Sequence, residues 1–153
     1  MEETLVILKP DALTRGLIGL ITSRLEQKGL QLTGCKMIQL SHDDLQKHYQ
    51  HLADKPFFPR IAEFMASRPV IVQCWRGVDA VDVVRTLAGI TNGRKAPAGT
   101  IRGDFSMSVQ CNLLHASDSG EAAKEERQRF FNNSELFGYD RVGNEFLYAR
   151  DEA

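Results

Sequence analysis

The stretch TLVILKPDALTRGLIGLITSRLEQKGLQLTGCKMIQL, residues 4–40, contains the hydrophobic patterns that decide the fold. Residues 4–8 are apolar and β-branched, which predicts a strand that ends at the following KPD. In residues 16–29 a helical face is formed by Leu17, Ile18, Ile21 and Leu25, and the glycine at the end is a typical helix stop. Residues 30–40 return to an alternating apolar pattern. The run therefore predicts a strand–helix–strand unit.

Further helices and a third strand follow this unit. Ser41 with Asp44 three residues later resembles a capping box and predicts a helix start. Pro56 suits the first turn of another helix, which runs toward Met65. Residues 70–75 are apolar and predict a third strand.

The second half of the chain alternates between regular and irregular patterns. Residues 78–89 have valines at helical spacing and predict a helix that a glycine ends. Residues 90–104, ITNGRKAPAGTIRGD, break every periodicity and predict a long ordered loop, a kind of segment that often carries function. Apolar residues alternate over residues 107–113 and predict a half-buried extended segment. A second capping box at residues 118–121 predicts a helix that runs to Phe131.

The order of these elements is β-α-β-α-α-β-α-loop-β-α. It predicts an α+β fold, an α/β sandwich with ferredoxin-like βαββαβ topology and a four-stranded antiparallel sheet covered by helices. No internal repeat or linker interrupts the sequence, so we expect residues 1–153 to form a single domain. The aromatic residues of the C-terminal segment, residues 135–153, have no period and predict coil.

The composition excludes several classes of protein. The chain of 153 residues is 42% hydrophobic and 25% charged, as in soluble globular proteins, and its net charge of -1 argues against a general nucleic-acid binder. The apolar run at residues 5–8 is too short for a signal peptide or a membrane span. Cys35, Cys74 and Cys111 are scattered, which favours reduced thiols in a cytoplasmic protein, and we expect all three to be small core residues.

His115, in NLLHASDS at residues 112–119, is the central candidate, because the sequence has no Walker loop, no G-x-G-x-x-G and no protein-kinase motifs. Alternation places His115 on the same face as Leu113, so a structural core histidine stays an alternative to a nucleophile. Ser117 and Asp118 lie at the predicted start of a helix, where free N–H groups favour an anion.

Glu126 lies about two turns into the same predicted helix, where its side chain leans back toward the helix start. A carboxylate that binds one imidazole nitrogen fixes the tautomer and leaves the other nitrogen free to attack. Taken alone, however, such a glutamate is more often a solvated helix residue paired with a neighbouring arginine.

A second set of candidates is cationic. Lys9 follows the first strand, Arg85 lies on the polar side of a valine-rich helix, and Arg102 lies in the glycine-rich loop. Taken singly, each of these cations is most simply an ordinary surface charge. Together, however, they come from a strand end, a helix and an ordered loop, and cations from such elements commonly converge on a phosphate site. Neutral donors are available from Tyr49, Thr91 and Asn112. Phe57 offers a ring that can stack on a flat base, although such an aromatic pair, here with Phe58, more often packs in the core.

Four motifs together resemble the nucleoside diphosphate kinase family: LVILKPDALTRGLIG, HYQHLADKPFF, GTIRGDF and NLLHASDS, in the family's order and spacing between about Thr4 and Phe137. The resemblance implies transfer of the γ-phosphoryl group from a nucleoside triphosphate to a nucleoside diphosphate, by a ping-pong mechanism through a phosphohistidine on His115. It implies ATP, GTP, ADP, GDP and their deoxy forms as partners, Mg²⁺ as cofactor, and neither a membrane nor a specific nucleic acid as partner.

The resemblance also implies the roles of individual residues. Glu126 and Ser117 match the positions that orient His115. Asp118 matches a position that acts on Mg²⁺ through water, with the metal held mainly by the nucleotide phosphates. The positions that hold phosphates, ribose and base are matched by Lys9, Tyr49, Phe57, Arg85, Thr91, Arg102, Val109 and Asn112.

The family further implies a homo-oligomer, with a hexamer favoured over a tetramer. Ala116 stands where many members have glycine, and the C-terminal EFLYARDEA departs from the frequent ending. Gly93 stands where many members have proline, and Pro97 is displaced by one place. Because proline lowers the entropy of the unfolded chain, we expect Gly93→Pro to raise the melting midpoint.

Two functions of other classes stay open on the residues alone. A nucleotide- or RNA-binding module on a ferredoxin-like sheet would make His115 structural, but the predicted strands contain only Trp75 where RNA-recognition modules have an aromatic stripe. A metal-dependent phosphohydrolase that uses His115 and Asp118 would need further histidine or carboxylate ligands. A phosphoenzyme trapped without an acceptor would separate the hydrolase from a phosphotransferase.

Overall fold

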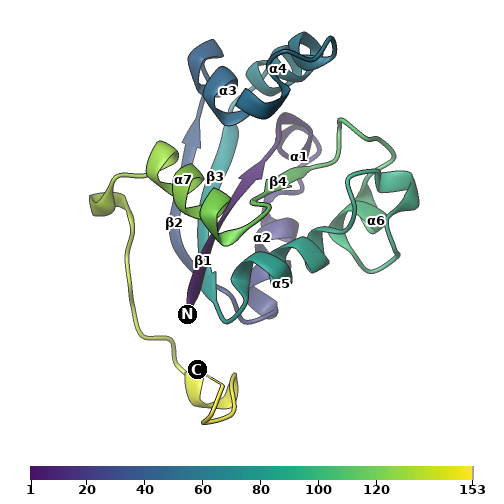
Figure 1. Ribbon diagram of the computed structural model, residues 1–153. Coiled ribbons are helices and arrows are strands. Elements are labelled where there is room, and N and C mark those ends of the chain that lie inside the picture. The colour runs from purple at the N-terminus through teal and green to yellow at the C-terminus, as the bar shows by residue number, and fades with distance from the viewer. Residues whose placement is uncertain (153) are drawn as a thin grey trace.

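The centre of the fold is a four-stranded antiparallel sheet, in a computed structural model that describes residues 1–152 (Figure 1). The strands lie in the order β2-β3-β1-β4, and each pair of neighbours is antiparallel. Their bounds are β1 Glu2–Leu8, β2 Gln31–Ile38, β3 Val70–Gly77 and β4 Leu114–Ala116. This strand order is that of the ferredoxin-like fold, so the predicted α+β class is confirmed.

Helices cover both faces of the sheet (Figure 1). Helices α2 and α5 pack on one face, and α3, α4 and α7 pack on the other. The helices are α1 Pro10–Thr14, α2 Ile18–Gln27, α3 His42–His48, α4 Phe58–Ala66, α5 Ala80–Ala88, α6 Ile101–Phe105 and α7 Gly120–Phe130. Because an RNA-binding sheet needs an open face, this coverage argues against the RNA-binding alternative.

Strand β1 is buried on both faces, which explains its unbroken apolar sequence. Leu5 and Ile7 pack in the cluster under α3, α4 and α7, whereas Val6 and Leu8 pack in the cluster under α2 and α5. All four side chains are fully buried, and each contributes about 1.5–3 kcal/mol on burial. The strand ends at the edge of the candidate site, so a strand with a fully buried apolar half positions Lys9.

Several helix boundaries differ from the sequence-based predictions. The chain forms the short helix α1 directly after β1, which was not predicted. Pro59, rather than Pro56, lies in the first turn of α4. Helix α7 has Ser119 as its N-cap, one residue after the predicted Asp118, and the Ser119 hydroxyl accepts the N–H of Ala122. The capping box predicted there is therefore wrong, although the one at Ser41 is confirmed.

The largest departure lies between α5 and β4. The predicted loop at residues 90–104 contains a 3₁₀ turn, Gly93–Lys95, and most of α6. Residues 107–113 do not form the predicted extended segment, because serine side chains bind the local backbone and compete with a strand ladder. The Ser106 hydroxyl donates to the carbonyl of Cys111 at 2.9 Å, and the Ser108 hydroxyl accepts two further N–H groups.

The cysteines are free, but only Cys74 is a core residue. Cys35 lies exposed on the edge strand β2, and Cys111 is exposed in the loop before β4. The expectation of three buried cysteines is therefore wrong for two of them, because an edge strand and a turn leave outward positions uncovered.

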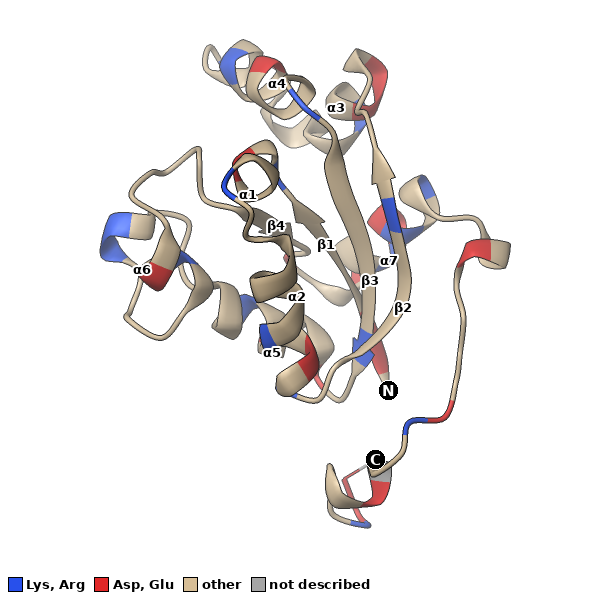
Figure 2. Cartoon of the chain, turned by 180° about the vertical axis from the view of Figure 1, so that it is seen from behind, with Lys and Arg blue, Asp and Glu red and all other residues tan. Residues whose placement is uncertain are grey.

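Basic and acidic residues are interspersed over the helices and strand ends (Figure 2). After α7 the chain runs as coil with isolated 3₁₀ turns, as predicted, and Arg141 donates to the carbonyls of Gly29 and Leu30 at the α2–β2 turn. Among the described residues, no helix combines the length and apolar character needed to cross a membrane.

Candidate active site

His115 occupies the middle of β4, paired with Ile7 of the inner strand β1. Leu113 has a left-handed backbone, with φ at 75°, and its side chain packs in the same cluster as Leu114. The strict alternation assumed from the sequence therefore breaks at Leu113, and His115 lies on the opposite face from it, beside α3 and α7. The left-handed turn is held by Asp11, whose carboxylate accepts the Leu113 N–H at 3.1 Å.

A carboxylate and a hydroxyl lie behind the His115 ring. Nε2 of His115 and Oε1 of Glu126 are 2.9 Å apart, and the Ser117 hydroxyl donates to Oε2 of the same carboxylate at 2.6 Å. Ser117 is fully buried and also accepts the backbone N–H of Leu5 at 3.2 Å. The three residues that the sequence placed together thus form a hydrogen-bonded chain anchored to β1.

The pKa of Glu126 is held below its usual value. Burial opposes the charge on this carboxyl, but the hydrogen bond and charge of His115, the hydrogen bond of Ser117 and the nearby His48 outweigh it. An ionised Glu126 accepts the proton of Nε2, which fixes the His115 tautomer with Nδ1 unprotonated.

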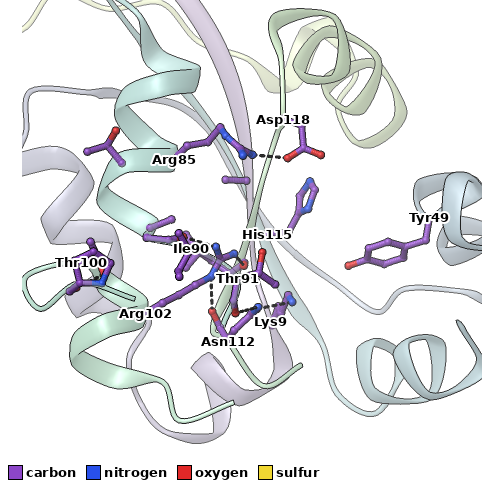
Figure 3. A pocket seen from close by; sticks show the side chains of 16 residues that line it. Lys9, Tyr49, Arg85, Ile90, Thr91, Thr100, Arg102, Asn112, His115 and Asp118 are labelled. Carbon is purple, nitrogen blue, oxygen red and sulfur yellow. Dashed lines mark hydrogen bonds and ion pairs between the residues drawn. The ribbon is translucent and has the colours of Figure 1, made fainter. Parts of the chain in front are cut away.

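The exposed side of His115 opens into a cavity of about 600 Å³. Figure 3 shows His115 between an ion pair above it and a cluster of polar side chains below it, with Tyr49 facing it from the segment after α3. The predicted site residues that line this cavity are Lys9, Tyr49, Arg85, Thr91, Arg102, Asn112, His115 and Asp118.

The polar cluster below His115 is built around Asn112. The buried Asn112 donates to the carbonyls of Thr91 and Val109, and its side-chain oxygen accepts from Nζ of Lys9 at 2.7 Å. Burial and the charge of Arg102 lower the pKa of Lys9 to about 8. Asn112 therefore fixes the lysine amine at the wall of the cavity.

Arg102 is tied to the backbone on three sides. It donates to the carbonyls of Asn112, Gly89 and Leu114 at 3.2, 2.7 and 2.6 Å. Burial and the charge of Arg85 lower the pKa of Arg102 to about 10, which still leaves it cationic at neutral pH. Its guanidinium is thus a fixed positive charge rather than a mobile surface group.

The ion pair above His115 joins Arg85 of α5 to Asp118, which precedes α7 (Figure 3). Both side chains are well exposed, at 47% and 76%. An exposed pair of this kind contributes little stability, so both groups are free to exchange partners with an incoming ligand.

A second cavity, of about 460 Å³, adjoins the first and shares four lining residues with it: Lys9, Tyr49, Thr91 and Asn112. Its other walls include Phe57 and Val109, which are 39% and 50% exposed, together with the apolar residues of α4. Arg60 and Gln110 also line this cavity but are not among the predicted site residues; the Gln110 amide donates to the Arg60 carbonyl at 3.1 Å. No motif signalled either residue.

A histidine held by a carboxylate, in a cationic cavity that continues into an apolar slot, is an arrangement that fits a phosphotransferase acting on nucleotides. The chain belongs to the nucleoside diphosphate kinase family, whose model matches residues 2–136. Nucleoside diphosphate kinase activity, with the phosphohistidine mechanism general to that family, is therefore the activity of this chain.

Relatives and solved structures agree with this assignment. The nucleoside diphosphate kinase of Parabacteroides distasonis is 59% identical over 152 residues, which are 99% of both chains. That of Pyrococcus horikoshii is 48% identical over 95% of this chain and 94% of its own. The Halobacterium salinarum enzyme, solved in complex with CDP, superposes with a TM-score of 0.94 at 41% identity, covering 97% of this chain and 99% of that one.

Proposed function

We propose that His115 is the residue that carries the phosphoryl group, through its Nδ1 atom. The observation that supports this proposal is the 2.9 Å contact between Nε2 and Glu126, which leaves Nδ1 as the free nucleophile. In the first half-reaction, Nδ1 attacks the γ-phosphorus, the bond to the β,γ-bridging oxygen breaks, and the nucleoside diphosphate leaves. In the second half-reaction, the terminal phosphate oxygen of another diphosphate attacks the phosphohistidine and restores the free ring.

Glu126 and Ser117 position His115 in this scheme. As Nδ1 gives its electron pair to phosphorus, the ring becomes more acidic, and the ionised Glu126 stabilises the growing positive charge on it. The buried hydroxyl of Ser117 keeps the carboxylate in place.

The remaining predicted residues would hold the nucleotide. Lys9, Arg85 and Arg102 provide the positive charge that a transferring phosphoryl group needs, because such transfer depends mainly on positioning and electrostatic stabilisation. The ribose and base would extend toward the second cavity, where the groups available for hydroxyls, phosphates and stacking are Tyr49, Thr91, Asn112, Phe57 and Val109.

We propose Mg²⁺ as the metal that accompanies the nucleotide. Asp118 is the one carboxylate among the described residues that line the phosphate cavity, and a single exposed carboxylate fits a metal held mainly by phosphates. Asp118 would hold such a metal through water, and the metal would supply charge neutralisation at the phosphates. Arg85, the present partner of Asp118, would turn to the phosphates.

We also propose broad use of bases. An exposed aromatic ring and an aliphatic side chain stack on any base without reading its hydrogen-bonding edge. The CDP bound to the Halobacterium salinarum relative supports a slot that takes a pyrimidine diphosphate.

We propose a single domain over residues 1–153 that assembles into a homo-oligomer, with a hexamer favoured over a tetramer. Large apolar side chains exposed on the single chain support an assembly: Met37, Phe137, Tyr139, Val142 and Phe146. Free, exposed thiols support a reducing, cytoplasmic location. Sedimentation at micromolar concentration tests the assembly, and a dimer or tetramer would contradict the hexamer.

Incubation with γ-labelled ATP and magnesium tests the assignment of His115. We expect an acid-labile, alkali-stable phosphoprotein that passes its label to CDP and does not lose it to water at a comparable rate. His115→Ala should abolish the label, whereas His42→Ala, at an exposed histidine of α3, should retain it. Label that persists in His115→Ala would contradict the proposal, and rapid loss of label without an acceptor would indicate a phosphohydrolase.

A further inference from the structure

A second histidine, His48 at the end of α3, packs directly against His115. The two ring centroids are 4.5 Å apart and the rings are nearly perpendicular, at 79°. Tyr49 and Phe130 surround the same ring with further edge contacts, at 4.6 and 5.4 Å between centroids. The His48 side chain is 1% exposed, so its place against His115 is fixed by close packing.

The surroundings of His48 keep it neutral. Its Nδ1 accepts from Arg129 at 3.3 Å and lies 3.8 Å from Oε1 of Glu126. Burial lowers the pKa of His48 to about 3, helped by the positive charge of His115 when protonated, of Arg129 and of His51, and opposed only by Glu126. A neutral His48 does not compete as an ion pair for the carboxylate that His115 uses.

His48, His115 and Glu126 also bring possible metal-ligand atoms within 4.8 Å of one another. The guanidinium of Arg129, however, donates to Nδ1 of His48, the atom of that ring nearest the carboxylate. A metal bound there would have to displace a fixed cation. The three side chains therefore fit direct contacts with one another better than a metal site.

We propose that His48 is a positioning residue for phosphoryl transfer, whose neutral ring holds the His115 imidazole edge-to-face in the orientation that joins Nε2 to Glu126. This inference rests on the proposed role of His115. The hydrogen bond to Glu126 fixes one atom of the ring but leaves the ring free to tilt about that contact. The perpendicular packing of His48 removes this tilt, and so it aims Nδ1 into the phosphate cavity.

Two substitutions test the ring contact of His48 and its hydrogen bond to Arg129 separately. His48→Phe keeps a flat ring against His115 but has no acceptor for Arg129. His48→Asn keeps a polar group near the position of Nδ1 but has no ring. Because a displacement of about 1 Å at a reacting group costs about 10²-fold in rate, we expect His48→Asn to slow single-turnover phosphorylation by about 10- to 100-fold. We expect His48→Phe to stay within about threefold of the parent rate.

Further measurements distinguish positioning from a general loss of structure. His48 lines neither nucleotide cavity, so the ADP dissociation constant of both variants, measured by calorimetry, should stay within about twofold of the parent value. The acid limb of the phosphorylation rate should move further to higher pH in His48→Asn than in His48→Phe, because both variants lose the effect of His48 itself on the pKa of Glu126, but only the asparagine also loosens His115. Nitrogen NMR of His115 should show one tautomer in the parent and in His48→Phe, and a mixture in His48→Asn.

Several results would overturn the inference. Equal phosphorylation rates in the parent and both variants would show that the ring contact does not matter. A slow His48→Phe beside a normal His48→Asn would assign the role to the Arg129 hydrogen bond instead. A rate loss matched by a loss of ADP binding would indicate a structural role. Mapping the label in the parent protein is independent of all three, because label on a residue other than His115 contradicts the proposed function itself.

Discussion

Ser117→Ala tests how the site is joined to the core. The substitution removes a fully buried hydroxyl that donates to Glu126 at 2.6 Å and accepts the backbone N–H of Leu5 at 3.2 Å. It leaves the β-strand pairing otherwise intact, since the Ser117 N–H still donates to the Leu5 carbonyl. The Leu5 N–H and the charged Glu126 carboxylate each lose a hydrogen-bond partner. The alanine methyl group occupies the place of the hydroxyl, so water does not replace it.

The magnitude follows from those two contacts. A hydrogen bond to a charged group contributes about 1.5–3 kcal/mol, and a buried donor without a partner costs about 1–3 kcal/mol. Because the two effects overlap in one side chain, we expect a loss of about 2–4 kcal/mol in the free energy of unfolding. For a chain of this size that loss lowers the melting midpoint by roughly 4–16 °C.

The loss should also depend on pH. The folded pKa of Glu126 lies below its unfolded value of about 4.3, so its contribution is present above that pH and disappears as the pH falls through the folded pKa. Without Ser117 the folded pKa rises toward the unfolded value, so the acid-dependent loss of stability should be smaller and should be complete at a higher pH than in the parent protein.

Urea unfolding at fixed protein concentration, between pH 7 and pH 3, measures both effects. Ser119→Ala is a matched control, because it removes the N-cap of α7 at an exposed position and should cost about 0.5–2 kcal/mol, with no change in the acid limb. A Ser117→Ala protein within about 0.5 kcal/mol of the parent, or one with the parent's acid limb, would refute the reasoning.

The affinity for ADP should weaken between pH 7 and pH 9, because the pKa of Lys9 is about 8 and its charge is lost as the pH rises; calorimetry should show that Lys9→Met removes this dependence. Arg102→Lys should cost at least about 2 kcal/mol in urea unfolding, since an ammonium cannot reach all three carbonyls, and an unchanged midpoint would contradict this. Gly93→Pro should lower the melting midpoint in calorimetry, opposite to the sequence-based expectation: the Gly93 N–H donates to Ser108 at 3.1 Å, and a Cβ there would lie 2.5 Å from the Ser106 carbonyl oxygen.

The elements with strong hydrophobic periodicity could be predicted from the sequence. Strand β1 and helix α2 were found where the pattern placed them, because burial on fixed faces leaves a regular spacing in the sequence. The contact between Glu126 and His115 was also predictable, since both lie close together in the chain and helix geometry sets the reach.

Features decided by single hydrogen bonds could not be predicted in this way. The alternation of residues 107–113 is that of a strand, but hydroxyls of Ser106 and Ser108 hold the chain in turns. His48 gave no signal either, because its contact with His115 joins segments 67 residues apart and leaves no pattern in either one. Such contacts depend on the tertiary arrangement of α3 and β4.

The left-handed backbone of Leu113 limits how this sequence can change. An ordinary residue in that conformation costs roughly 1–2 kcal/mol, and glycine would remove the cost. The Leu113 side chain is fully buried, however, and truncating a buried leucine costs about 2–5 kcal/mol. Replacing Leu113 by glycine thus costs more free energy of unfolding through lost packing than it recovers from the relaxed backbone. A single substitution that relaxes the chain at this position therefore destabilises the protein. An engineer who seeks a more robust enzyme would have to refill the core first, from a neighbouring position, before the backbone beside His115 could be eased.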